Sequence, residues 1–216
     1  MSGIEAAAAA RSRRCAAVNS AGRARAFANA ARISAAAGLV WGSLVPAAQA
    51  ACTDWPKWIA AGCSELVDVY EHGDNGMLVS GYSWHVPYTW TPERRAELNA
   101  NAWGGGPIRT KEDPDGDTRS IFLLVFKDSH SHAQWNLGYE HSTYWGPRSG
   151  LQAGLGFTAV IVQRPDIANG IPFPAVLPIA SLRYDKATLF ATYIPTLNGG
   201  INHGSTLYVF GKVMFK

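Results

Sequence analysis

One stretch of the sequence decides the fold: Ile121-Phe122-Leu123-Leu124-Val125-Phe126-Lys127-Asp128-Ser129. Its six apolar residues include β-branched and aromatic side chains, which favour a strand. The run then ends abruptly in an ammonium group, a carboxylate and a hydroxyl. An apolar strand meets such polar chemistry where it comes to a surface. We therefore predict a membrane-spanning strand with a reactive group at its tip.

The rest of the chain after residue 76 has the patterns of further strands and no convincing pattern of another helix. In residues 151–163, apolar side chains from Leu151 to Ile161 fall on one face, while Gly154 and Gly156 fall on the other. The lengths suit tilted transmembrane strands of about 9–11 residues. Eight strands are expected, at about residues 76–88, 102–111, 118–128, 133–145, 151–163, 175–184, 187–195 and 206–215.

An even number of antiparallel strands that closes on itself leaves no open edge, as a lipid environment requires. Short turns after the fourth and sixth strands alternate with longer loops, which is typical of an outer-membrane barrel. A soluble eight-stranded ligand-binding barrel also alternates and is the alternative. The aromatic residues near the strand ends are expected to form the interface girdles: Trp84, Trp90, Trp103, Tyr144, Trp145 and Tyr193.

Residues 54–71 have the pattern of an amphipathic helix. Thr53 and Asp54 offer a cap, and Pro56 suits the first turn. The apolar residues recur at helical spacing and form one stripe. Such a helix packs on a soluble core or lies on a membrane surface. With the barrel, the second arrangement is expected, on the periplasmic side with the short turns.

Residues 1–50 predict a cleaved secretory signal peptide with a basic leader. An apolar run from Ile33 to Val45 is followed by the small-x-small sequence Ala48-Gln49-Ala50. Ser12-Arg13-Arg14 resembles a twin-arginine signal only faintly, so ordinary export is expected. Cleavage removes six arginines and one glutamate, which changes the net charge from +3 to −2. The excess of basic residues therefore lies in the signal peptide, and no nucleic-acid partner is implied.

Two cysteines, Cys52 and Cys63, remain after cleavage, in an oxidising compartment where a disulfide is possible. On one continuous helix they would lie about 16 Å apart along the axis, which is too far to bridge. They pair only if the chain bends near Pro56, and the sequence leaves both outcomes open.

The predicted topology brings the ends of the first and third strands to the same outer rim, with His85 on one and Asp128 and Ser129 on the other. A histidine is a general base near neutral pH, and a carboxylate and a hydroxyl can support it. Neighbours in a regular strand point to opposite sides, which makes a linear Asp–His–Ser array awkward. We expect His85 to act as a base toward an acceptor hydroxyl, supported by Asp128 and Ser129.

Two other patterns are not expected to form sites. The run from Gly104 to Gly106 lacks the Lys-Ser/Thr sequence that follows in a phosphate loop. His130, His132 and His141 lack a recognisable ligand spacing, so no metal site is predicted.

Six blocks of the sequence together resemble the lipid A palmitoyltransferase (PagP) family over essentially the whole of residues 51–216. They are Tyr82-Ser83-Trp84-His85, Trp103-Gly104-Gly105-Gly106, Phe126-Lys127-Asp128-Ser129, Leu155-Gly156-Phe157-Thr158-Ala159, Leu177-Pro178-Ile179-Ala180-Ser181 and Thr192-Tyr193-Ile194-Pro195. The resemblance implies an all-β fold, an eight-stranded antiparallel transmembrane β-barrel with an N-terminal amphipathic periplasmic helix.

The resemblance also implies an activity: transfer of a palmitoyl or similar chain from the sn-1 position of a glycerophospholipid to a hydroxyl of a lipid A acyl chain, with release of lysophospholipid. No cofactor is implied, and the active site faces outward from the cell outer membrane. The catalytic histidine, aspartate and serine of the family match His85, Asp128 and Ser129. The acyl pocket of the family lies inside the barrel, which suits the small inward residues Gly154 and Gly156.

The sequence departs from the family pattern at the pocket and at one lateral opening. Glu140 aligns with the glycine of the pocket floor, which puts the acyl-chain length in question. Prolines that flank the opening between the first two strands are replaced by Ser80 and Ala102. Those of the second opening are kept as Pro178 and Pro195, so access is expected between the sixth and seventh strands.

Two competing functions remain, a phospholipase-like hydrolase that uses water as the acceptor and a non-enzymatic structural barrel. The sequence contains no G-x-S-x-G elbow, and the convergence of His85, Asp128 and Ser129 argues against a purely structural role. A monomer is expected.

Overall fold

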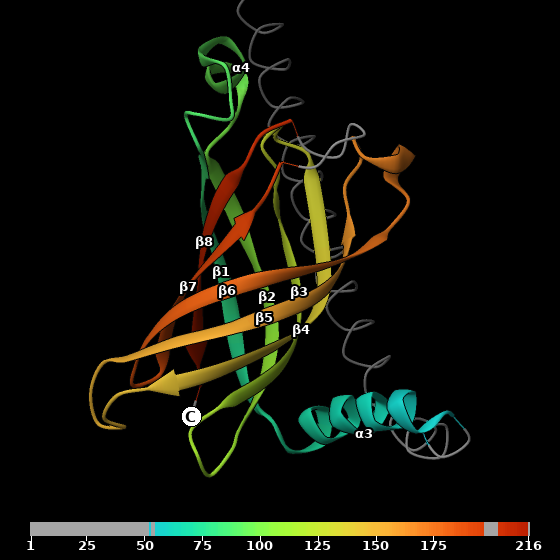
Figure 1. Ribbon diagram of the computed structural model, residues 1–216, viewed down its shortest axis with the longest axis vertical. Helices are drawn as coiled ribbons and strands as arrows, with labels where there is room; N and C mark the ends of the chain where they lie inside the picture. Colours follow the sequence, from blue (N-terminus) through green and yellow to red (C-terminus); the bar gives the residue numbers. More distant parts are fainter. Residues whose placement is uncertain (1–51, 53–54, 197–202, 216) are drawn as a thin grey trace, which may run out of the picture. The chain divides into compact units, whose positions relative to one another are not determined.

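Eight antiparallel strands join edge to edge in sequence order, and the last strand pairs with the first to close a barrel (Figure 1). This computed structural model describes residue 52, residues 55–196 and residues 203–215. It has two compact units, residues 1–61 and 62–216, and every strand lies in the second. The strands are β1 (Asp74–His85), β2 (Asn101–Glu112), β3 (Thr118–Lys127), β4 (Ala133–Trp145), β5 (Gln152–Gln163), β6 (Phe173–Tyr184), β7 (Ala187–Ile194) and β8 (Thr206–Met214).

The prediction of an eight-stranded antiparallel barrel is confirmed, and β5 shows why it succeeded. Leu155, Phe157 and Ile161 are exposed on its outer face, while Thr158 and Val160 are buried on its inner face. This is the period of two that a barrel strand requires. An apolar outer face around a closed sheet is the pattern of a barrel in contact with lipid.

Helix α3 (Lys57–His72) corresponds to the helix predicted at residues 54–71. Thr53 and Asp54, its expected cap, lie outside the described residues, as does the whole of the signal peptide expected at residues 1–50. Cys52 and Cys63 are both disulfide-bonded. Among the described residues, no helix has the length and apolar character needed to cross a membrane.

The prediction of no helix beyond residue 76 is wrong. Helix α4 (Pro92–Glu97) lies between β1 and β2, at the barrel end opposite the short hairpins (Figure 1). Thr91 caps it by accepting a hydrogen bond from the Arg94 amide, and Pro92 occupies the first turn. A single turn of 3-10 helix, η1 (Ala168–Gly170), lies between β5 and β6. Both helices are too short to show the apolar periodicity that predicted α3.

Polar side chains attach the C-terminal part of α3 to the barrel strands of the same unit. The carboxylate of Glu65 accepts hydrogen bonds from Arg119 on β3 at 2.8 Å and from the Tyr139 hydroxyl on β4 at 3.2 Å. Asp68 pairs with Lys111 on β2 at 2.5 Å. The hydrogen bond from Lys111 lowers the pKa of Asp68 below its ordinary value. These contacts fix residues 62–72 of α3 against the strand ends that carry short turns.

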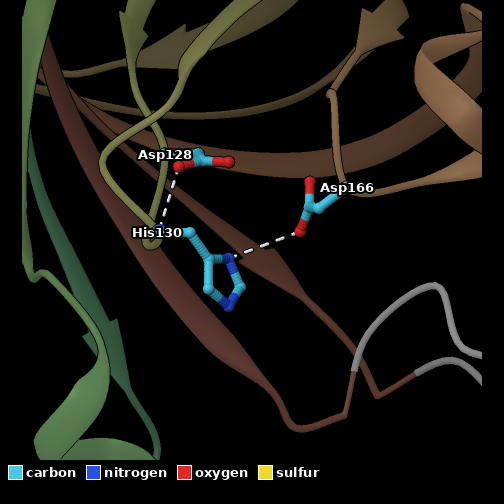
Figure 2. Close-up of side chains that lie close together, drawn as sticks. All are labelled: Asp128, His130 and Asp166. Carbon is cyan, nitrogen blue, oxygen red and sulfur yellow. Dashed lines mark hydrogen bonds and ion pairs between the residues drawn. The ribbon is translucent and has the colours of Figure 1, made fainter.

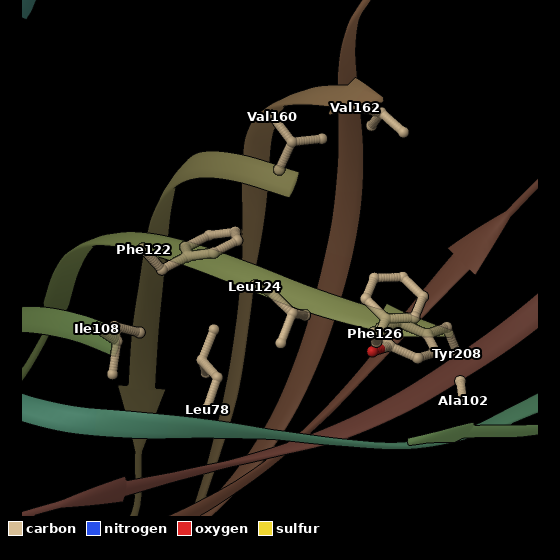
Figure 3. Close-up of a cluster of buried hydrophobic side chains, with 9 residues drawn as sticks. All are labelled: Leu78, Ala102, Ile108, Phe122, Leu124, Phe126, Val160, Val162 and Tyr208. Atoms are coloured by element: carbon tan, nitrogen blue, oxygen red, sulfur yellow. The ribbon is translucent and has the colours of Figure 1, made fainter. Parts of the chain in front are cut away.

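The barrel interior is divided into an apolar part and a polar part. Apolar side chains from five strands pack together inside the barrel (Figure 3), and they are Leu78, Ala102, Ile108, Phe122, Leu124, Phe126, Val160, Val162 and Tyr208. Toward the short turns, buried Arg183 donates to Gln152 at 2.9 Å and to the Gly116 carbonyl at 3.0 Å. Its guanidinium lies 3.9 Å from the Tyr144 ring centroid. This network closes the turn-bearing end of the barrel.

The expected girdle residues separate into two groups. Trp84, Trp103, Trp145 and Tyr193 are exposed, as an interface position requires. Tyr144 is instead buried under Arg183, and Trp90 is directed into the barrel mouth, where it contacts His85. The prediction is wrong for these two residues, because an aromatic residue near a strand end is compatible with either face.

Close approach of two backbones accounts for Gly156. A Cβ atom there would lie 1.8 Å from the carbonyl oxygen of His141 on β4. We predict that Gly156→Ala lowers the free energy of unfolding by about 1–3 kcal/mol, the usual cost of forcing extra atoms into a packed interior. Urea titration in detergent micelles, followed by far-ultraviolet circular dichroism, measures this change.

Gly211→Ala is the matched control, since a Cβ there meets its nearest atoms at 3.9 Å, an ordinary contact. Equal stability of the two variants would contradict the close approach at Gly156.

Candidate active site

His85 and Ser129 meet at the loop-bearing rim, as the sequence predicted. His85 is the last residue of β1, and Ser129 follows β3 by two residues. The Nε2 atom of His85 lies 2.9 Å from the Ser129 hydroxyl oxygen. His85 is only 5% exposed, so the imidazole is largely shielded from solvent. A shielded histidine in contact with a hydroxyl is a suitable general base.

Asp128 shapes the β3–β4 turn that presents Ser129. Its Oδ1 atom accepts hydrogen bonds from the backbone amides of His130, at 2.9 Å, and His132, at 2.8 Å. The turn is completed by the Ser131 amide, which donates to the Asp128 carbonyl at 3.0 Å. Within the described part of the chain, Asp128 forms no hydrogen bond with His85, and its buried Oδ2 atom has no hydrogen-bond partner. Asp128 therefore positions the turn and does not complete an Asp–His–Ser line.

The loop between β5 and β6 adds a second carboxylate beside this turn (Figure 2). Asp166 Oδ2 lies 3.4 Å from Nδ1 of His130 and accepts a hydrogen bond from Arg164 at 2.7 Å. Burial raises the pKa of the Asp166 carboxyl, but the hydrogen bond and charge of Arg164 outweigh burial and hold this pKa below its ordinary range. Asp166 is therefore a carboxylate at neutral pH.

Trp90 and Ser205 support the histidine, and sequence reasoning missed both. The Trp90 ring packs edge-on against His85, with ring centroids 5.4 Å apart. Its Nε1 atom donates to the Ser205 carbonyl at 2.9 Å, and the Ser205 amide donates to the Thr89 hydroxyl at 2.8 Å. These contacts join the β1–β2 loop to the start of β8. No local pattern marks such residues, since the contacts form between segments distant in the sequence.

A cavity of about 170 Å³ extends inward from the His85–Ser129 pair. His85, Asp128 and Ser129 line it at the rim. Its deeper lining is mostly apolar and comes from β3, β5, β6, β7 and β8, including Phe122, Leu124, Val160, Leu177, Ile194 and Phe210. An apolar cavity that leads away from a polar reactive pair is suited to a hydrocarbon chain.

Glu140 lies below this cavity, in the lining of a smaller one that shares Phe122, Thr158 and Phe210 with it. Glu140 is 3% exposed, and it accepts hydrogen bonds from Ser120, at 2.6 Å, and from Ser142. The Nζ atom of buried Lys212 lies 4.0 Å from its Oε2 atom. The buried carboxylate is thus held within a polar group of side chains.

The remaining predicted site residues lie outside the lining of the described cavities. Gly154 faces the Tyr144 ring and the Ser181 hydroxyl in the polar part of the barrel, and Gly156 faces the β4 backbone. Their small size is explained by close packing at these positions. Pro178 and Pro195 are exposed, and they flank the part of the β6–β7 boundary that is nearer the loop-bearing rim.

The two predicted lateral openings differ in structure. Pairing between β6 and β7 runs only from Tyr184 and Ala187 to Ile179 and Thr192, although β6 continues to Phe173. Beyond that point the Thr192 hydroxyl bonds the Pro178 carbonyl at 2.8 Å. Between β1 and β2, Ser80 instead donates to the Ala102 carbonyl, and pairing continues to Tyr82 and Asn101. The cavity therefore approaches an unpaired boundary at β6–β7, where Leu177 and Ile194 line it.

Comparison with known families identifies one that matches residues 65–212, described as the antimicrobial peptide resistance and lipid A acylation protein PagP. The matched region contains the whole barrel up to β8 residue 212, and it includes His85, Asp128 and Ser129.

Curated relatives agree with this match. The chain is 37% identical over 172 residues to the lipid A acyltransferase PagP of Bordetella parapertussis, which covers 80% of this chain and 93% of the relative. The protein of the same name from Methylobacillus flagellatus is 37% identical over 173 residues, with 80% and 92% covered. That from Legionella pneumophila is 34% identical over 162 residues, with 75% and 85% covered.

The role of Asp128 in the turn can be measured directly. Asp128→Ala removes the acceptor of two backbone amides, so hydrogen exchange at His130 and His132 should accelerate by about 10- to 100-fold. Asp128→Asn keeps a carbonyl oxygen in the same place and should accelerate exchange less. Amide exchange followed by nuclear magnetic resonance distinguishes the variants. Unchanged protection in Asp128→Ala would show that other contacts hold the turn.

Proposed function

The chain belongs to the PagP family of lipid A acylation proteins, and on this premise we propose that it moves a palmitoyl or similar chain from the sn-1 position of a glycerophospholipid to a hydroxyl of a lipid A acyl chain. The observation that carries the proposal is the contact of 2.9 Å between His85 and Ser129 at the mouth of an apolar cavity inside a closed barrel. The same barrel encloses the donor chain and presents its ester to the reactive pair.

The proposed reaction is a direct transfer with His85 as the general base. The imidazole takes the proton of the acceptor hydroxyl as that oxygen attacks the donor ester carbonyl. The ester C–O bond to glycerol then breaks, and the imidazolium returns the proton to the glycerol oxygen, which releases lysophospholipid. Ser129 holds the imidazole and can donate a hydrogen bond to the oxyanion that develops. No cofactor takes part in these steps.

Donor entry is proposed to occur between β6 and β7. Backbone groups left unpaired in lipid cost free energy, so an unpaired strand boundary needs local compensation. Here Pro178 lacks an amide hydrogen, and its carbonyl accepts the Thr192 hydroxyl. An acyl chain that passes this boundary meets Leu177 and Ile194, which line the cavity. The prolines thus lower the cost of a gap in the barrel wall.

The protein is proposed to lie in the cell outer membrane. A closed barrel with an apolar outer face and this family membership fit the cell outer membrane. Residues 1–50 are proposed to be the cleaved signal peptide, with α3 on the periplasmic side and the site facing outward. The protein is proposed to act as a monomer on phospholipid and lipid A.

Loss of the histidine or the serine tests the proposed roles. His85→Ala should lower the transfer rate by about 100- to 10,000-fold, the contribution of a positioned acid–base group. Ser129→Ala should lower it by about 100- to 1,000-fold, the contribution of one oxyanion donor, and both barrels should stay folded. The measurement is the mass of lipid A and the amount of lysophospholipid after incubation with the purified protein in mixed micelles.

His141→Ala is the matched control, because His141 lies on β4 against the Phe157 ring and away from the cavity lining. Full transfer by His85→Ala would refute the assignment. Lysophospholipid release by the wild type without any gain in lipid A mass would identify a hydrolase instead, and no change in either lipid would indicate a structural barrel.

The floor position makes a separate prediction about chain length. Glu140→Gly removes the buried carboxylate below the cavity and should shift the preferred acyl chain toward a greater length. Glu140→Gln is the matched control, since it keeps the volume and should leave the length unchanged. Mass spectrometry of the modified lipid A measures the chain. An unchanged profile in Glu140→Gly would show that the floor lies elsewhere.

A further inference from the structure

The β3–β4 turn and the β5–β6 loop bring together a set of side chains that the transfer mechanism does not fully use. Asp128, His130 and Asp166 each offer one ligand atom, and these atoms lie within 4.8 Å of one another (Figure 2). Two carboxylates and an imidazole are ligands of divalent metal ions. The sequence predicted no metal site because the histidine spacing alone was unfamiliar and Asp166 comes from another loop.

Asp128 provides an independent indication of a ligand. Its side chain is 1% exposed, and Oδ1 is already bonded to two backbone amides. The buried Oδ2 atom has no hydrogen-bond partner, and Figure 2 shows this end of the carboxylate directed toward Asp166. A buried acceptor without a partner costs free energy. A cation beside Oδ2 would remove that cost.

We propose that Asp128, His130 and Asp166 form a binding site for a divalent transition-metal ion of the zinc class. The separation of 3.4 Å between His130 Nδ1 and Asp166 Oδ2 is close to the value of about 3.3 Å that two ligands of one tetrahedral zinc ion have. Nδ1 of His132 lies 3.9 Å from Asp128 Oδ2, next to this set of three.

The composition of the site selects among metal ions. Imidazole nitrogens favour zinc, nickel and copper, whereas magnesium and calcium prefer ligand sets made of oxygen. The guanidinium of Arg164 neutralises one of the two carboxylates, to which it is bonded at 2.7 Å. One net negative charge remains for the ion. His130 and His132 are about half exposed, so they are free to move toward a bound ion, while Asp128 is fixed.

A bound ion would also affect the reaction. It would tie the β3–β4 turn to the β5–β6 loop at the mouth of the cavity, which His130 and Arg164 help to line. It would also engage the carboxylate next to Ser129. We expect bound zinc to inhibit transfer, and this consequence alone rests on the proposed function.

Binding is tested first, without reference to activity. The full mature protein, free of an affinity tag and stripped with a chelator, is titrated with zinc chloride in detergent by isothermal calorimetry. We expect one ion per chain. His130→Gln and Asp166→Asn should each weaken binding by about tenfold or more, and the control His141→Gln should bind as the wild type does. Absence of saturable binding, or equal binding by all variants, would overturn the site.

Inhibition is tested on the same samples. Zinc should lower transfer by the wild type at concentrations that fill the site, and Asp166→Asn should need at least tenfold more zinc for the same effect. Equal inhibition of the two proteins would overturn the link between the site and the reaction. A protein that binds zinc but shows no transfer without it would instead contradict the proposed function, so the two failures are distinguishable.

Discussion

Complete pairing of the backbone is the constraint on which the rest of this structure depends. A chain surrounded by lipid cannot satisfy its amides and carbonyls with water, so the sheet must close on itself. Closure of β8 onto β1 meets this requirement and also creates an interior that is isolated from the membrane. The boundary between β6 and β7 is left unpaired beyond Ile179 and Thr192, toward the loop-bearing rim. There Pro178 has no amide hydrogen, and its carbonyl accepts a hydrogen bond from the Thr192 hydroxyl. Local chemistry thus makes an exception to closure tolerable at this boundary, where we propose that the donor lipid enters.

The closed interior sets the geometry of the site. Because β2 is antiparallel to both of its neighbours, β1 and β3 run in the same direction and end at the same rim. This brings together His85 and Ser129, which are 44 residues apart in the sequence. The carboxylate of Asp128 then turns the chain back immediately after β3, through hydrogen bonds to two backbone amides. The Ser129 hydroxyl is therefore held on a turn that these hydrogen bonds fix, which favours a fixed contact with the imidazole.

The sequence could predict what depends on periodicity and topology, and it failed where packing decides. The eight strands and the meeting of His85 with Ser129 follow from alternation and strand direction. Helix α4 was missed because six residues are too few to show a stripe, although Thr91 and Pro92 carry its capping signal. Trp90 was placed on the outside because aromatic residues at strand ends suit both faces. Asp166 joins the site through folding of a distant loop, which no local pattern encodes.

On the proposed function, a fixed group of polar side chains around Glu140 sets the length of the acyl chain. An apolar side chain at the floor of a cavity can change its rotamer and make room. Glu140 is instead held by hydrogen bonds from Ser120 on β3 and Ser142 on β4, and it faces the Nζ atom of Lys212. A methylene group that entered this level would displace a hydrogen-bond donor from a buried carboxylate. The displacement costs about 1–3 kcal/mol, which exceeds the roughly 0.8 kcal/mol that burial of the methylene returns. The boundary between apolar and polar interior is therefore sharp in energy as well as in position. On this proposal, the chain length that fits is set by where that polar group begins.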